Sequence, residues 1–534
     1  MREVTARIED RTRQLHDHAF FRWLNDANCP LDQRFAFSPV LVEFIMGFSD
    51  MNKWFLSYRE PETRFHEEIN EHTLEDRTHS RWFVDDWIKL DFNGRLGWSA
   101  SETLWWWFLC GETELIRRLA METLELTVQH EDPLERFAMM QAIEACGDVF
   151  FGNTVNVARE LGAKTGLEYR YFGDFHRARE TGHLHADEDL FTTSILRSEQ
   201  RERALRLVDR MFDMFVEELD CLHDYARRAT EHPAELREAL AAEREAMLGH
   251  PAVDTAREST PDAGLDVTQA KLLEVFEVRK GRLMAHPFVA WLRDESGPPP
   301  AEKLQRFVPL WAIDILGYAD FNRYILRYRD PKDEAERAIN QWTEQLASRS
   351  ALYFRDWRAL GLDERLRWQP DQVISFYFLG EESELHRRNM AKVKIFAISR
   401  PAPSARFWLM RALEAGRDAL LEAAAPLVTE TEQQRGVRLD YWARRDFSPS
   451  STGGELDALR LFSAVPLAPG SEDALLQAVN TIFDNFEEQF SLSLRVARSN
   501  FIRASEANAE YVSEARLRSG AESGVGRSAT GSGK

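Results

Sequence analysis

The sequence predicts an all-α protein that contains two tandem copies of one helical bundle domain. Three observations lead to this fold class: a long internal repeat, apolar residues at helical spacing within each copy, and a scarcity of strand-type alternation. The chain has 534 residues, which exceeds what one hydrophobic core usually supports. We therefore expect more than one domain.

The internal repeat has an offset of 270 residues. Segment 48–61 (FSDMNKWFLSYREP) recurs as segment 318–331 (YADFNRYILRYRDP), and the same offset pairs Trp87 with Trp357. Such self-similarity indicates a duplicated structural unit. The predicted organisation is a first domain at 16–226, a linker with some helix at 227–283, a second domain at 284–497 and a disordered tail at 519–534.

The elements of the first copy follow from helical periodicity. Within 62–91, apolar and histidine side chains recur at alternating steps of three and four residues, which is typical of one face of a single helix. Pro61 and the neighbouring acidic residues suit the start of that helix. Further long helices are expected at about 38–58, 101–128, 133–163 and 199–227.

Charge and composition exclude several function classes. The formal net charge is −21 and no segment is dominated by lysine and arginine, which argues against nucleic-acid binding. The longest apolar stretch is far below the roughly 18 residues of a membrane span, and the charged N-terminus lacks an apolar signal core. The spacing of the four cysteines (Cys29, Cys110, Cys146 and Cys221) indicates no disulfide framework, which is typical of a reducing compartment. We therefore expect a cytoplasmic protein without a membrane partner.

Two segments of the first copy share the pattern H-x3-[DE]-x2-H. The residues of this pattern are His72, Asp76 and His79 in the first segment, and His176, Glu180 and His183 in the second. Positions i, i+4 and i+7 of a helix lie on one stripe, so each segment would project two imidazoles and one carboxylate into the bundle. The repetition of this spacing predicts a shared metal site.

Each of these segments is preceded by a carboxylate in apolar surroundings, Glu43 before the first and Glu144 before the second. Four helices would then supply the acids and imidazoles that enclose two metal ions in a bundle. Buried carboxylates are costly unless they are paired, protonated or metal-bound, and mixed His/carboxylate sets suit iron, manganese or zinc. The ligand from the 62–91 segment stays open among His72, Glu75 and Asp76.

The second copy lacks most of these residues. Ile313, Trp342, Leu346 and Arg349 stand where the first copy has Glu43, His72, Asp76 and His79. Asp446, Ser450 and Gly453 replace His176, Glu180 and His183. Only Glu144 is retained, as Glu414, which leaves a structural role with an arginine partner open for this position. We expect the second copy to be free of metal.

The motif and the ligand order resemble those of the haem-oxygenase-like di-iron oxidase and oxygenase superfamily, in which a histidine also lies four residues before the acid of a D/E-x-x-H pair. The resemblance covers the first copy in motif and the second only in its helical frame. It implies two iron ions, with manganese as an alternative, that activate O2 as co-substrate. It also implies an external reductant and a small organic substrate derived from an amino acid, an amine or a fatty acyl group.

Two other functions compete with this oxidoreductase hypothesis. Cys146 lies two residues after Glu144, so a thiaminase-like helical hydrolase that uses both side chains is one alternative. A non-catalytic metal-binding protein is the other. The oligomeric state cannot be inferred from the sequence.

Overall fold

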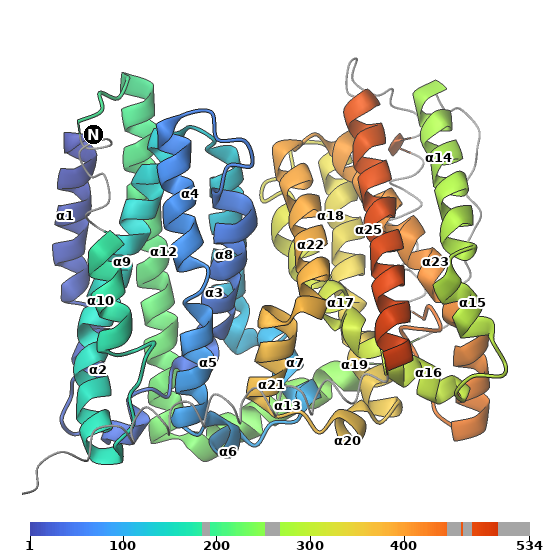
Figure 1. The fold of residues 1–534 in the computed structure, drawn as a ribbon, viewed down its shortest axis with the longest axis horizontal. Coiled ribbons are helices and arrows are strands. Elements are labelled where there is room, and N and C mark those ends of the chain that lie inside the picture. The colour runs from blue at the N-terminus through green and yellow to red at the C-terminus, as the bar shows by residue number, and fades with distance from the viewer. Residues whose placement is uncertain (184–192, 251, 253–266, 446–460, 463–471, 500–534) are drawn as a thin grey trace, which may run out of the picture.

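The computed structural model describes residues 1–183, 193–250, 252, 267–445, 461–462 and 472–499, with side chains left out at 180–183 and 267. Every element in these ranges is a helix, which confirms the all-α prediction. Two helical bundles stand side by side, and α13 (Pro233–Gly249) runs beneath them (Figure 1). None of the described helices is long and apolar enough to cross a membrane.

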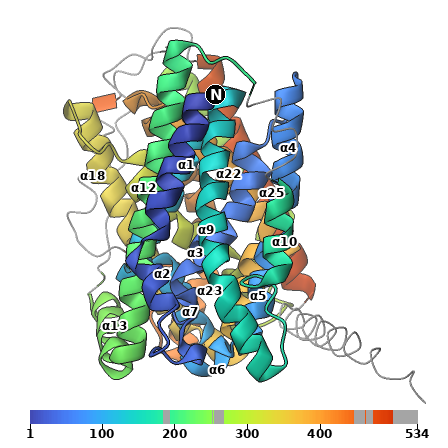
Figure 2. The same cartoon turned by 90° about the vertical axis from the view of Figure 1, so that its left-hand side faces the viewer.

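The first bundle is built around two long helices, α9 and α12, with α1 packed along both and α3 against α8 (Figure 2). Its elements are α1 (Arg2–His16), α2 (Ala19–Leu24), η1 (Leu31–Gln33), α3 (Ser38–Met51), η2 (Asn52–Leu56), α4 (Arg64–Asp76), α5 (Ser80–Lys89), α6 (Phe92–Leu96), α7 (Ala100–Phe108), η3 (Gly111–Thr113), α8 (Glu114–Gln129), α9 (Pro133–Thr165), α10 (Asp174–His183) and α12 (Ser198–Glu231).

The second bundle repeats most of this order of helices, although its described residues include no counterpart of α10. Its elements are α14 (Val267–Met284), α15 (Pro287–Arg293), α16 (Pro300–Phe307), η4 (Val308–Trp311), α17 (Ala312–Asp320), η5 (Phe321–Leu326), α18 (Glu334–Ser348), α19 (Ser350–Ala359), α20 (Leu362–Leu366), α21 (Pro370–Ile374), η6 (Ser375–Leu379), α22 (Glu381–Ser399), α23 (Pro403–Arg435) and α25 (Glu472–Ser499). The helices α1 and α14, which begin before the expected domain starts at 16 and 284, pack onto the long helices of their own bundles.

The longest repeated helix shows how local sequence sets the element boundaries. The carboxylate of Asp132 accepts hydrogen bonds from the first turn of α9, and Pro133 occupies its first position. Gly166 ends the helix with φ of 74°, a left-handed conformation that glycine adopts without strain. The equivalent helix α23 likewise starts with a proline and ends at Gly436 with φ of 65°.

The structure corrects two of the expected helices. Segment 62–91 is not continuous: α4 ends at Asp76, and α5 begins after His79, where the Ser49 hydroxyl donates to the Arg77 carbonyl at 2.7 Å. Segment 101–128 is likewise broken into α7 and α8 around Gly111. The hydrophobic period continues across both breaks, so periodicity alone does not reveal them.

Reciprocal contacts join the two bundles. Asp50 forms an ion pair with Arg387 at 3.0 Å, and Asp320 forms one with Arg117 at 2.9 Å. These four residues are two equivalent pairs, because Asp320 follows Asp50 and Arg387 follows Arg117 by the repeat offset. Each bundle therefore presents the same surface to the other, as in a two-fold symmetric dimer.

Further contacts follow the same local symmetry. The Asn93 amide donates to the Asp371 carboxylate at 2.6 Å, and the equivalent pair has the Ser101 backbone N–H donating to Asp363 at 2.9 Å. On the symmetry axis the equivalent rings of Phe108 and Phe378 stack on each other, with centroids 6.2 Å apart. The interface between the bundles is thus isologous, within a single chain.

Candidate metal centre

Helices α4 and α9 bring three of the predicted ligands together. The Nε2 atom of His72 lies 3.1 Å from Oδ2 of Asp76 and 3.2 Å from Oε1 of Glu144. One donor atom from each residue falls within 4.8 Å of the others, a spacing that can hold a metal ion. Asp76 and Glu144 are buried, so their charges need a cation nearby.

Two more imidazoles extend this group. Nδ1 of His79, at the start of α5, lies 4.0 Å from Oδ1 of Asp76 and 3.0 Å from Nε2 of His176 on α10. Nδ1 of His176 lies 2.9 Å from the Tyr171 carbonyl oxygen, which can only accept, so this nitrogen carries the proton. The tautomer leaves a lone pair on Nε2 of His176, as metal ligation requires.

A buried aspartate fixes the segment that leads into α10. Asp86 accepts backbone N–H bonds from Arg170, Tyr171 and Phe172 at 2.7, 2.9 and 3.0 Å. Because the Tyr171 carbonyl orients His176, Asp86 positions that imidazole indirectly. Burial raises the pKa of Asp86 to about 7 against the lowering effect of these hydrogen bonds.

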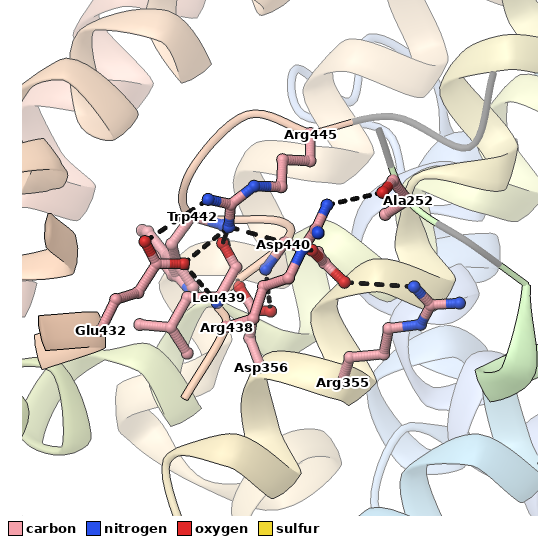
Figure 3. A network of polar contacts seen from close by, with 9 residues as sticks. All are labelled: Ala252, Arg355, Asp356, Glu432, Arg438, Leu439, Asp440, Trp442 and Arg445. Atoms are coloured by element: carbon pink, nitrogen blue, oxygen red, sulfur yellow. Dashed lines mark hydrogen bonds and ion pairs between the residues drawn. The ribbon is translucent and has the colours of Figure 1, made fainter. Parts of the chain in front are cut away.

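In the second bundle an equivalent aspartate holds the equivalent segment (Figure 3). Asp356 accepts from the backbone N–H groups of Asp440 and Trp442 at 2.6 and 2.9 Å, and a set of arginines around Glu432 and Asp440 holds the same segment. The Asp-Trp pairs at 86–87 and 356–357 are therefore structural in both copies.

The cluster faces a small cavity of about 80 Å³ inside the first bundle. The cavity is lined by Asp76, His79, Glu144 and His176, and its other walls are mainly aromatic: Phe44, Phe48, Phe150, Phe151, Tyr171 and Phe215. Burial would lower the pKa of His72 beside this cavity, but hydrogen bonds with Asp76 and Glu144 and their charges raise it well above its usual value. The acids thus attract positive charge to this point.

The other predicted ligands are not part of the described cluster. Glu43 on α3 does not line the cluster cavity but lines a second cavity between the bundles. Glu75 is exposed, whereas Asp76, which follows it, is buried in the cluster. Glu180 and His183 belong to α10 in backbone, but their side chains lie outside the described residues.

Sequence reasoning missed a buried carboxyl group, Glu218 on α12. It lines the same cavity as His79 and Glu144, and burial raises its pKa to about 8. Within the described parts of the chain, Glu218 has no hydrogen-bond or ion-pair partner. Its place among Phe215, Leu219 and Leu222 on the apolar face of α12 was the available signal.

The second bundle has an equivalent cavity of about 90 Å³, which is lined by a salt bridge in place of the cluster. Glu414 accepts from Arg349 at 2.9 Å and from Arg417 at 2.8 Å, which is the arginine partnership considered for this position. Trp342 and Leu346, at the positions of His72 and Asp76, are buried. The remaining substitutions, Asp446, Ser450 and Gly453, lie outside the described residues.

The comparisons with known proteins add no relative. No family model matches the chain, and no curated protein matches its sequence. We therefore infer function from the geometry of the cluster.

Proposed function

We propose that the chain is a dioxygen-dependent oxidoreductase whose first bundle holds a pair of iron ions, with manganese as the alternative. The observation that carries this proposal is the group of two carboxylates and three imidazoles in the first bundle, of which all but the half-buried His72 are buried: His72, Asp76, His79, Glu144 and His176. The sequence pattern adds Glu180 and His183 on α10. Glu43 is left out of the ligand set because it lines the other cavity.

The donor set fits such a metal pair. Nitrogen and carboxylate oxygen donors together suit first-row transition metals, and two carboxylates are available to bridge two cations. Nε2 of His176 and Nδ1 of His79 lie 3.0 Å apart, so two ring nitrogens converge from different helices. The Tyr171 carbonyl supplies the hydrogen bond that commonly orients a metal-ligating histidine.

When bound, the metal pair would supply the electrons and the site at which O2 is activated, with an external reductant restoring it. The protein itself holds the ligands and controls access. Asp86 and the Tyr171 carbonyl keep the His176 ring in place. The aromatic walls, including Phe44, Phe151 and Phe215, exclude bulk water and favour a small organic substrate with apolar character. The substrate is proposed to be derived from an amino acid, an amine or a fatty acyl group.

The hydrolase alternative receives no support from the thiol. Cys146 is buried, and its pKa is raised well above the usual value by burial and by the nearby charge of Glu218. Nucleophilic cysteines instead have a lowered pKa, because the thiolate is the reactive form. Cys146 also lines the cavity between the bundles, whereas Glu144 lines the cluster cavity.

Metal content tests the proposed centre. Protein from iron-replete cells is expected to contain close to two metal ions per chain by elemental analysis. His79→Ala and His176→Ala should each lower metal affinity by about ten- to hundred-fold or more, because each removes a nitrogen donor. Glu414→Gln, the matched change at the equivalent of Glu144 in the second bundle, should leave the metal content unchanged, and Trp342→His alone should add none.

Oxygen reactivity separates an enzyme from a metal store. On mixing with O2, the reduced protein should consume oxygen and change its visible absorbance, and both signals should disappear in His79→Ala. Metal that binds at full occupancy without any reaction with oxygen would favour the non-catalytic metal-binding function. Unchanged iron in both histidine variants would reject the ligand assignment.

A further inference from the structure

A second cavity, of about 130 Å³, lies between the two bundles. Its volume corresponds to roughly ten water-sized spaces, enough for a small organic molecule. The first bundle contributes most of the wall, through α3, α8 and α12, and the second contributes α17 and α22. The lining is largely apolar and rich in flexible or aromatic side chains, among them Phe44, Met51, Trp54, Met211, Met214, Phe215 and Met390.

Several charged residues in this cavity break the symmetry of the interface: Asp314 is paired with His386, whereas Glu43 and Lys394 have no ion-pair partner in the described residues. Glu43 lines it from α3, and its equivalent in the second bundle is Ile313. Lys394 lines it from α22, and its equivalent in the first bundle is Leu124. The cavity therefore contains an acid and an amine, Glu43 and Lys394, that line it from opposite bundles without ion-pair partners in the described residues, and a second such acid, Glu218 on α12. It is dipolar, although the surrounding interface is symmetric.

Glu43 has no partner for its charge among the residues that the structure describes. It is 9% exposed, and its Oε2 atom is fully buried without a hydrogen-bond partner within the described residues. Burial, followed by repulsion from Asp320, raises the pKa of Glu43 to about 7. The other acids near it are paired, Asp50 with Arg387 and Asp320 with Arg117.

Lys394 is the complement of Glu43 on the opposite wall. Burial lowers the pKa of Lys394, and the charge of Glu43 is the largest influence that opposes this effect. The two head groups are nevertheless not in contact: within the described ranges, no ion pair of 4.0 Å or less joins them. Glu218, the other acid without a partner in the described residues, lies on α12, and its pKa is raised by burial alone.

We propose that this cavity binds a free α-amino acid with a large apolar side chain. The ammonium group of the ligand would bind the Glu43 carboxylate, and the ligand carboxylate would bind the Lys394 ammonium. Such a ligand provides an oppositely charged partner for both side chains at once, which neither a fatty acid nor a simple amine does. Its side chain would pack among the methionines and aromatic rings that line the first bundle.

The bound amino acid would lie next to the candidate metal centre. Five residues line both cavities and form a common wall: Phe44, Phe48, Ile143, Phe215 and Glu218. The proposal deepens the proposed function by naming a substrate class for it, and to that extent rests on it. Binding itself needs no metal, because none of the five described cluster residues lines this cavity.

The test is isothermal titration calorimetry on the metal-depleted full-length chain with L-phenylalanine and L-methionine. Both are expected to bind, whereas N-acetyl-L-phenylalanine and L-phenylalaninamide, which each lack one charge, should bind about ten- to hundred-fold more weakly. Glu43→Gln and Lys394→Met should each weaken L-phenylalanine binding by a similar factor. Circular dichroism confirms that the variants are folded.

Glu414→Gln is the control, because it changes a buried acid of the second bundle outside this cavity. It should leave amino-acid binding unchanged, and Glu43→Gln should leave the iron content unchanged. Equal binding of the acetylated ligand, or unchanged affinity in both variants, would overturn the proposal. Loss of iron in His79→Ala together with no amino-acid binding to any form would reject the ligand while sustaining the metal centre.

Discussion

Arg117→Met is expected to lower the free energy of unfolding by about 3–5 kcal/mol, the cost of removing one partner of a buried ion pair. Arg117 and Asp320 are 1% and 2% exposed in their side chains and lie 2.9 Å apart across the interface. The substitution leaves the Asp320 carboxylate buried without its cation, and burial already raises the pKa of that group. Arg117 also donates to the Cys110 carbonyl at 3.0 Å, so a second buried acceptor loses its partner.

The local symmetry supplies the control for this prediction. Arg387→Met removes the equivalent arginine, but Asp50 is 19% exposed in its side chain and can recover part of its hydration. The loss of unfolding free energy in Arg387→Met should therefore be smaller than in Arg117→Met. Urea unfolding followed by circular dichroism compares the two variants directly. The double variant Arg117→Met, Asp320→Leu should regain most of the stability, since both charges are then gone. Equal losses of unfolding free energy in the two arginine variants would contradict the difference in burial between Asp320 and Asp50.

Glu218→Gln is expected to stabilise the metal-depleted protein at alkaline pH. Burial raises the pKa of folded Glu218 to about 8, whereas a glutamate in the unfolded chain loses its proton near pH 4.3. The folded state therefore binds more protons between these values, and linkage makes stability fall as the pH rises through this window. The full penalty, up to about 5 kcal/mol, is present above pH 8 and absent below pH 4.

Glutamine has no proton to lose, so the variant should escape this decline. Chemical unfolding at pH 5 and pH 9 measures the effect, with Glu199→Gln as the control on the same helix. Glu199 is 89% exposed in its side chain, so its replacement should change stability little at either pH. A wild-type stability that does not fall relative to Glu218→Gln between pH 5 and pH 9 would show that Glu218 has a cationic or hydrogen-bonding partner.

The sequence contained enough to predict the helical class and the order of the repeated helices. The reason is physical: the apolar stripe of each helix must face its bundle, and the duplication imposes the same stripes twice. The breaks at His79 and Gly111 were missed because they depend on tertiary contacts. The bond from the Ser49 hydroxyl to the Arg77 carbonyl, for example, joins helices that are distant in sequence.

The site could be predicted in part for a similar reason. His72 and Asp76 share a helical face with a consistent period, so spacing alone brought them together. Glu43 lies on α3, which is apolar and buried on nearly every side, so its period does not show which neighbour the acid faces. Glu218 was missed because it is not part of an H-x3-[DE]-x2-H pattern, and only the packed bundle places it beside the cluster.

The reciprocal contacts between the bundles have a consequence for how this molecule can behave and change. Two separate subunits with the same contacts would come apart on dilution, whereas here the connecting segment holds each half at a fixed effective concentration near the other. The pairing therefore cannot be lost at low abundance. Covalent linkage also guarantees that a half with the imidazole cluster always meets a half without it, which identical subunits cannot arrange. One half is free to specialise while its twin supplies the matching surface.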